Sequence, residues 1–329
     1  MNSDRPSAEM LSRRTIMKAA VALTGAASAQ VLGVYSALAQ DYPTQELTWI
    51  IYQSPGGLID GSSRAVQPFL KKAGFESRIE YVRGASGRIA RTQLFRSKPD
   101  GYTIMTEASP EEVLGEVVYS AEYKVAELQP VFGWFINAFN VYVQKSSTIK
   151  TFSDFVDTAK SRTVTIGTLG KGGPSHLQLA VLRKKLGLKL QFVHFQGGAP
   201  AYSALLGGHV DAAIGGSSSA RYVDTVNFIA VFRNGRDPAL PNVPTLSELG
   251  HPDVAPINEV IYVNTGPGVS SDRIAKLAAA FKRTFEDPEQ VKLQQNLGVY
   301  PTLMSGEDLK KIIQNMYALV NEHKAELSG

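Results

Sequence analysis

Short apolar runs alternate with helical patterns along most of the chain, and glycine-rich turns separate them. In the first such unit, residues 47–52 read as a strand, 54–57 as a turn and 60–73 as a helix whose apolar residues recur three and four positions apart. Strands that alternate with helices are typical of a sheet covered by helices. The pattern therefore predicts an α/β fold.

Similar units recur further along the chain. A strand at 163–166 precedes a glycine-rich turn and a helix at 174–186, which has proline at its first position and glycine beyond its last. Almost the same arrangement follows, with a strand at 190–195 and a helix at 200–206. The remaining predicted strands lie at 77–82, 102–107, 210–214 and 260–264, and the remaining predicted helices at 89–97, 271–285 and 306–327.

The N-terminus has the pattern of an export signal. Arg13 and Arg14 precede an uncharged stretch from 19 to 38, and residues 37–39 form a small-x-small sequence that a signal peptidase accepts. Paired arginines before a weakly apolar stretch resemble a twin-arginine signal. We expect residues 1–39 to be a cleavable twin-arginine signal peptide and the mature protein to work in the periplasm. An uncleaved membrane anchor is the alternative.

Composition narrows the class of protein. Removing 39 residues from 329 leaves 290, which suits two domains of ordinary size. The formal charge is only +4 and no run of Lys or Arg interleaves with aromatic residues, so nothing favours a nucleic-acid partner. The sequence contains no cysteine, no Walker A pattern and no histidine pair at metal-ligand spacing. We expect a monomer without metal or cofactor.

Three glycine-containing turns share one design, at 55–60, 167–175 and 196–201. In each, a strand ends, the backbone is exposed and a helix begins with free N–H groups, which carry about half a positive charge. In an open α/β sheet such turns lie at the carboxyl ends of strands, where ligands bind. The shared preference is for an anion.

Six motifs then occur in the order of a known family. They lie at 54–60 with Arg64, 84–89, 98–103, 167–177, 197–211 and 241–245. Together they resemble the extracytoplasmic receptors of tripartite tricarboxylate transporters, also called Bug receptors. The resemblance implies a two-lobed type II periplasmic-binding (Venus flytrap) fold, each lobe a mixed sheet flanked by helices. The expected lobes are 40–140 with 258–329, and 141–257.

The resemblance also implies a function, namely capture of a small carboxylate between the lobes for the membrane subunits of a transporter. Carried over residue by residue, it implies ligand contacts at Pro55, Gly56, Gly57, Leu58, Ile59, Asp60, Ser86, Thr168, Gly170, Gly172, Gly173, His176, Gly198, Ala199 and Asp211.

Departures from the family pattern suggest the ligand class. Leu58 and Ile59 stand where small residues are usual, so an apolar edge would suit a hydrocarbon or aromatic body, while Arg88 or Lys171 would clamp a second carboxylate. We therefore favour a di- or aromatic carboxylate. The alternative for each cation is a solvated surface residue.

Three site residues have structural alternatives. Asp60 could be the N-cap of its helix, because an Asx side chain there accepts from free N–H groups. His176 could be packed or hydrogen-bonded within its own helix, and Asp211 could orient a loop.

An exported α/β hydrolase acting on an ester or amide is the competing class. Its nearest candidate nucleophile lies among Ser217–Ser219, with His194 and His209 in reach, yet no Gly-x-Ser-x-Gly sequence occurs. We expect no catalytic residues and no enzyme. A binding protein that serves a membrane sensor would use the same pocket and is the third class.

Overall fold

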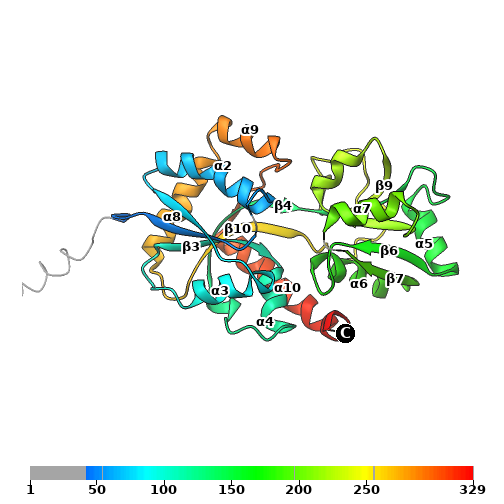
Figure 1. Ribbon diagram of the computed structural model, residues 1–329, viewed down its shortest axis with the longest axis horizontal. Coiled ribbons are helices and arrows are strands. Elements are labelled where there is room, and N and C mark those ends of the chain that lie inside the picture. The colour runs from blue at the N-terminus through cyan, green and yellow to red at the C-terminus, as the bar shows by residue number, and fades with distance from the viewer. Residues whose placement is uncertain (1–41, 54, 196, 255, 329) are drawn as a thin grey trace, which may run out of the picture. The chain divides into compact units, whose positions relative to one another are not determined.

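The computed structural model describes residues 42–53, 55–195, 197–254 and 256–328. The expected signal peptide at 1–39 lies outside these residues, so its cleavage and export route stay predictions. Residues 45–329 form one unit, which contains two sheets and their flanking helices (Figure 1). The predicted α/β pattern is present in both sheets.

The first sheet has six strands in the order β11-β4-β10-β3-β1-β2. β1 (Leu47–Ile51) pairs in parallel with both β2 (Ser77–Tyr81) and β3 (Thr103–Ser109). β10 (Glu259–Thr265) is antiparallel to β3 and to β4 (Gln129–Asn137), and β11 is the short strand Met304–Ser305. The helices in the same parts of the chain are α2 (Leu58–Lys72), α3 (Arg88–Phe95), α4 (Glu111–Val117), α8 (Ser271–Thr284), α9 (Pro288–Asn296) and α10 (Gly306–Ser328).

The second sheet has five strands in the order β7-β6-β8-β5-β9. β6 (Val164–Thr168) is parallel to β7 (Leu190–His194) and β8 (Ala212–Gly215), while β5 (Phe139–Gln144) is antiparallel to β8 and to β9 (Val226–Phe232). Its helices are α5 (Phe152–Ser161), α6 (Pro174–Leu186) and α7 (Gly198–Leu206). Short 3₁₀ turns occur at η1 (Ala85–Gly87), η2 (Val125–Glu127) and η3 (Ser217–Tyr222).

The chain passes between the sheets in two places. The first passage is the single residue Ala138, between β4 and β5, and the second is the segment between β9 and β10. Both sheets are therefore mixed, with parallel strands from βα units and antiparallel strands next to the passages. The lobe boundaries at 140/141 and 257/258 stay predictions.

Aromatic side chains fill the core of the first sheet. Phe281 of α8 meets Trp49 edge-on, with ring centroids 5.5 Å apart, and stacks on Trp134 at 6.3 Å. Each indole N–H also has a buried acceptor, since Trp49 donates to Thr106 Oγ1 and Trp134 to Ser62 Oγ, both at 2.8 Å. The two tryptophans are therefore fixed by packing and by hydrogen bonds.

The last helix, α10, contacts elements of both sheets. It packs on β4 and α4, and also on α6, the helix that follows β6 (Figure 1). Near its C-terminus Glu326 pairs with Arg183 and Glu322 pairs with Lys184 at 2.9 Å. No helix in the described part of the chain has the length and apolar character needed to cross a membrane.

Candidate functional site

A buried arginine organises the turn that follows β2. Arg91 of α3 is fully buried and donates to both carboxylate oxygens of Glu107, at 2.7 and 2.5 Å. Its Nη1 donates to the Ser86 carbonyl at 2.8 Å, and its Nη2, which also binds Glu107, lies 3.4 Å from Glu111 Oε2. One guanidinium thus connects η1, the end of β3 and the start of α4.

The η1 turn needs this support because its backbone is unusual. Ala85 and Ser86 have φ values of 49° and 52°, a region that L residues seldom adopt. Gly87 has φ 81°, and a Cβ there would lie 2.7 Å from the Tyr52 ring and 2.9 Å from Arg91 Nη1. The turn therefore depends on glycine at 87 and on the Arg91 hydrogen bond, and it presents Ser86 and Arg88 together.

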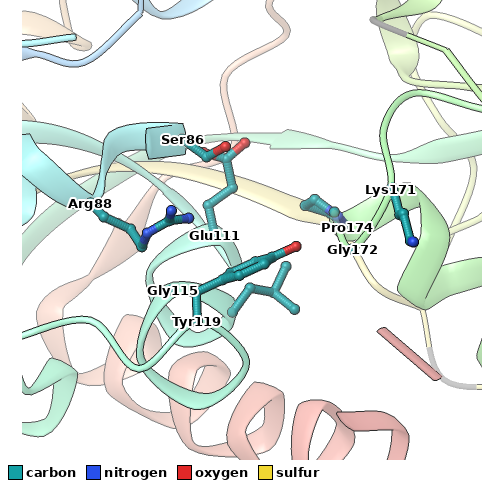
Figure 2. A pocket seen from close by; sticks show the side chains of 10 residues that line it. Ser86, Arg88, Glu111, Gly115, Tyr119, Lys171, Gly172 and Pro174 are labelled. Carbon is teal, nitrogen blue, oxygen red and sulfur yellow. The ribbon is translucent and has the colours of Figure 1, made fainter. Parts of the chain in front are cut away.

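These two residues line an open cavity of about 370 Å³, which we call the Arg88 cavity (Figure 2). Arg88 lies over the ring of Tyr119, with its guanidinium carbon 4.7 Å from the ring centroid. The opposite wall comes from the loop between β6 and α6. The lining residues are Ser86, Arg88, Glu111, Leu114, Gly115, Tyr119, Lys171, Gly172, Gly173 and Pro174.

The β6–α6 loop approaches Tyr119 closely at one point. Gly172 has φ 66°, and a Cβ there would lie only 2.0 Å from the Tyr119 hydroxyl. His176 stabilises the loop from inside, because its Nδ1 accepts the Gly172 N–H at 3.1 Å. Burial, together with the charges of His194, Arg183 and Lys171, lowers the pKa of His176 to about 4, so the ring stays neutral.

A second cavity of about 470 Å³ lies at the N-terminus of α7, and we call it the Tyr142 cavity. It shares the β6–α6 loop with the Arg88 cavity, through Leu169. Its floor includes Tyr142 of β5, which is fully buried. The lining residues are Asn137, Tyr142, Leu169, Gly198, Ala199, Gly215, Gly216, Ser218, Ser219, Arg221 and Tyr222.

The two cavities collect part of the predicted site. Ser86, Arg88, Lys171, Gly172 and Gly173 line the Arg88 cavity, and Gly198 and Ala199 line the Tyr142 cavity. Thr168 is buried below the loop, where its hydroxyl contacts His194 Nδ1 at 2.8 Å, and the backbone of Gly170 lies in the loop itself with open space beside it. The turn of Pro55, Gly56, Gly57, Leu58, Ile59 and Asp60 lines neither cavity.

Asp60 is held by the protein itself. Its carboxylate accepts from the Gly56 N–H at 2.8 Å, from Arg64 Nε at 2.9 Å and from the Tyr81 hydroxyl at 2.5 Å. Burial alone would raise the pKa of Asp60, but these three partners bring it below the ordinary value. The N-cap interpretation was wrong, because the helix begins at Leu58 with Gly57 as its N-cap.

Two further expectations change. Ile59 is only 2% exposed and Leu58 is half-buried, so only part of the apolar edge predicted from these two residues lies at the surface. Asp211 binds the Thr165 N–H and hydroxyl, both at 2.8 Å, and pairs with Arg162. Thr165 lies near the start of β6, at the opposite end from the loop, so we leave Asp211 out of the proposed site.

Two of the three clustered serines have structural partners, and the third, Ser218, lines the Tyr142 cavity. Ser217 donates to Asp237 Oδ2 at 2.7 Å and Ser219 donates to Asn140 Oδ1 at 2.8 Å. These bonds hold the turn after β8 and leave both hydroxyls committed to groups other than a histidine. Among the described residues, no group of three His, Cys, Asp or Glu side chains is placed to hold a metal ion.

The sequence reasoning missed the buried acidic residues of the first sheet and of helix α4. Glu107 and Glu112 are fully buried, and Glu259 accepts from Asn137 Nδ2 at 2.5 Å. Burial raises the pKa of Glu112 to about 8, with Glu107 adding to the shift, and burial raises that of Glu259 to about 7. A glutamate at the end of the predicted strand 102–107 was the available signal, since charged groups are buried only with a partner.

Comparison with known proteins identifies what this arrangement is similar to. Residues 64–323 match the family described as the tripartite tricarboxylate transporter family receptor, TctC. A UPF0065 protein from Agrobacterium vitis is 28% identical over 282 residues, which cover 80% of this chain and 79% of the relative. "Protein BugT" from Bordetella pertussis is 26% identical over 224 residues, which cover 65% of this chain and 69% of the relative.

Solved structures show the same fold. A TctC solute-binding protein from Polaromonas superposes with a TM-score of 0.76 at 22% identity, covering 85% of this chain and 99% of that one. MatC from Rhodopseudomonas palustris with bound malate superposes with a TM-score of 0.68 at 22% identity, covering 85% of this chain and 100% of MatC. An R. palustris protein with adipate superposes with a TM-score of 0.71 at 22% identity, covering 88% of this chain and 99% of that one. The two-lobed periplasmic-binding fold is confirmed.

Proposed function

Because the chain belongs to the family of tripartite tricarboxylate transporter receptors, we propose that it is a periplasmic receptor that captures a small carboxylate and delivers it to the membrane subunits of such a transporter. The ligand binds between the loops that follow β2 and β3 on one side and the loop that follows β6 on the other. No step of the proposal involves catalysis.

The observation that supports this proposal most directly is the lining of the Arg88 cavity. Arg88 comes from the first sheet's helices and Lys171 from the loop of the second sheet, so cations face the same space from two sides (Figure 2). Among the described lining residues Glu111 is the one acidic side chain, and it lies beside Arg91. An anion gains charge-assisted hydrogen bonds here, which are roughly twice as strong as neutral ones.

The cavity also supplies apolar surface. Leu114 and the ring of Tyr119 line it beside the cations, and they take the role that the sequence assigned to Leu58 and Ile59. A carboxylate with a hydrocarbon or aromatic body fits this combination. The relatives with malate and adipate each bind a dicarboxylate, which supports the same class for this chain.

Isothermal titration calorimetry of wild-type protein against mono-, di- and aromatic carboxylates tests the proposal. Replacing Arg88→Gln removes a charge-assisted hydrogen bond, so affinity for every bound carboxylate should fall by about tenfold or more. The matched control is Arg96→Gln. Arg96 is the C-cap of the same helix, α3, where it forms an exposed ion pair with Glu122.

Two results would contradict the receptor function. One is the failure of every carboxylate in the panel to bind, and the other is equal binding by the Arg88→Gln and Arg96→Gln variants. Turnover of a carboxylate ester or amide by the purified protein would instead support the hydrolase alternative. Thermal denaturation of each variant shows whether lost binding reflects lost folding.

A further inference from the structure

The Tyr142 hydroxyl is a buried polar group for which the protein provides no partner among the described residues. The Tyr142 side chain is 0% exposed. An unsatisfied buried hydroxyl destabilises a fold, and phenylalanine at this position would avoid that cost while keeping the same ring. A tyrosine here therefore requires an explanation outside the packing of the core.

The ring of Tyr142 is held in one position. It packs on Phe228 with centroids 5.3 Å apart, and a Cβ at Gly215 would lie 2.9 Å from its edge. Among the groups whose charges act on its hydroxyl are Tyr222 and Arg221, which line the same cavity. Burial raises the pKa of Tyr142 above its ordinary value, so the hydroxyl is a hydrogen-bond donor at neutral pH.

The N-terminus of α7 adds two more donors to this cavity. Gly197 is the N-cap and provides no side chain to bind the first N–H groups, while Gly198 and Ala199 begin the helix and line the cavity. Pro200 has no N–H, so the free donors of the first turn are concentrated at these two residues. The helix dipole favours an anion at the same place.

The charge of the lining agrees with an anion. Arg221 is the charged side chain among the described lining residues. Its guanidinium carbon lies 4.8 Å from the centroid of the Tyr222 ring, and its Nη2 donates to the Tyr222 hydroxyl at 2.8 Å. Tyr222 is itself stacked on Tyr202, with ring centroids 3.7 Å apart. Phenol, amide and guanidinium donors thus converge on one space whose described lining has no carboxylate, and this set matches an oxyanion such as a carboxylate.

We propose that the Tyr142 cavity binds one carboxylate of a dicarboxylate ligand, with the Tyr142 hydroxyl as a donor that selects for it. The inference rests on the proposed function, because the other carboxylate of the same ligand lies in the Arg88 cavity. One loop connects the two cavities, since Leu169 lines one and Lys171 the other.

This placement predicts a specific kind of selectivity. A ligand whose far end is a methyl group would leave the Tyr142 hydroxyl and the α7 N–H groups unpaired on closure. Sites built to hydrogen-bond a polar group discriminate strongly against analogues that lack it. The protein should therefore prefer a dicarboxylate over the monocarboxylate of equal length.

Isothermal titration calorimetry tests the inference. Linear dicarboxylates from succinate to suberate are each compared with the monocarboxylate of equal chain length. Wild type should bind its best dicarboxylate at least tenfold tighter than that analogue. Tyr142→Phe should lose this preference by weakening only the dicarboxylate, and its melting temperature should not fall. The matched control Tyr202→Phe removes a hydroxyl that bonds Thr225 outside the cavity lining, so binding should change less than twofold.

Each outcome separates the two proposals. The role of Tyr142 is overturned if wild type binds both acids equally, or if Tyr142→Phe keeps the wild-type preference for the dicarboxylate. Either result leaves carboxylate capture intact. Arg88→Gln should weaken both acids, and its failure to do so contradicts the proposed function instead. If Tyr142→Phe does not fold, Arg221→Gln decides, because it should weaken the dicarboxylate severalfold and leave the monocarboxylate unchanged.

Discussion

Replacing Glu107→Gln would leave the Arg91 guanidinium in the interior without its bidentate partner. Both side chains are 0% exposed, and Glu107 accepts from Arg91 at 2.7 and 2.5 Å. Breaking a buried ion pair from one side costs about 3–5 kcal/mol. Glu111, 3.4 Å from Arg91, offsets part of that cost, so we expect a loss of about 3 kcal/mol in the free energy of unfolding.

Urea denaturation followed by tryptophan fluorescence measures this loss. The protein has two tryptophans, Trp49 and Trp134, and both are buried in the sheet that contains Glu107. For a chain of this size the free energy of unfolding falls by about 3 kcal/mol per molar urea. The midpoint should therefore move down by about 1 M in Glu107→Gln, with the slope unchanged.

An exposed ion pair provides the control. Arg96 and Glu122 lie 2.5 Å apart with side chains 67% and 69% exposed, and Glu122→Gln should change the free energy of unfolding by less than about 1 kcal/mol. A Glu107→Gln variant as stable as Glu122→Gln would refute the reasoning. It would mean that the Arg91 charge is compensated without Glu107, and that the η1 turn does not depend on this pair.

Two pH predictions follow from buried groups. The pKa of His176 is about 4 in the folded protein, against an ordinary 6.5, so the unfolded chain binds the proton first as pH falls. The free energy of unfolding should therefore drop by about 3 kcal/mol as pH falls from 6.5 to below 4. His176→Gln should flatten this part of a plot of unfolding free energy against pH. An unchanged slope in the variant would contradict the lowered pKa of His176. The effect of pH on the contribution of Glu112 to stability has the opposite sign, because burial raises the pKa of Glu112 to about 8. Its stabilising contribution is present at low pH and is lost between pH 4.5 and 8, so Glu112→Gln should melt above wild type at pH 8 and close to it at pH 4, which thermal scans at both pH values can check.

The alternation of strands and helices was readable from the sequence wherever a glycine turn separated them. The helix predicted at 174–186 is α6 with the same bounds, because proline and Gly187 fix both ends. The strands β4 and β5 were not predicted. Their residues are buried on both faces, so the run from 131 to 143 lacks the alternation that identifies a strand.

Helix α5 shows what local chemistry could have added. Thr151 and Asp154 form a capping box, in which each side chain accepts from the backbone N–H of the other, and the pattern Thr-x-x-Asp was visible in the sequence. Helix α4 gave a weaker signal. It has only seven residues and begins with two glutamates after Pro110, and tertiary contacts with β3 and α10 stabilise it.

The candidate site was predictable in part for a physical reason. Glycine turns before helices are recognisable in sequence, and Gly172, Gly173 and Gly198, which were predicted in this way, line the two cavities; their contact with ligand stays a prediction. A carboxylate such as Asp60 looks the same in sequence whether it faces a ligand or binds its own turn. Tyr142 was hidden, because inside an apolar strand a tyrosine reads as another hydrophobic residue. Only the fold shows which of these side chains border a cavity.

Arg91 contacts three chain segments at once, and this has a consequence for how the binding surface can change between related receptors. Arg88 lines the cavity and its guanidinium lies over the Tyr119 ring, so substitutions of this side chain alter the lining without touching the Arg91–Glu107 pair. Arg91 and Glu107 carry the fold and are out of the ligand's reach, so they can change only together. New specificities are therefore accessible by single substitutions at the rim, provided the pair beneath it is inherited unaltered.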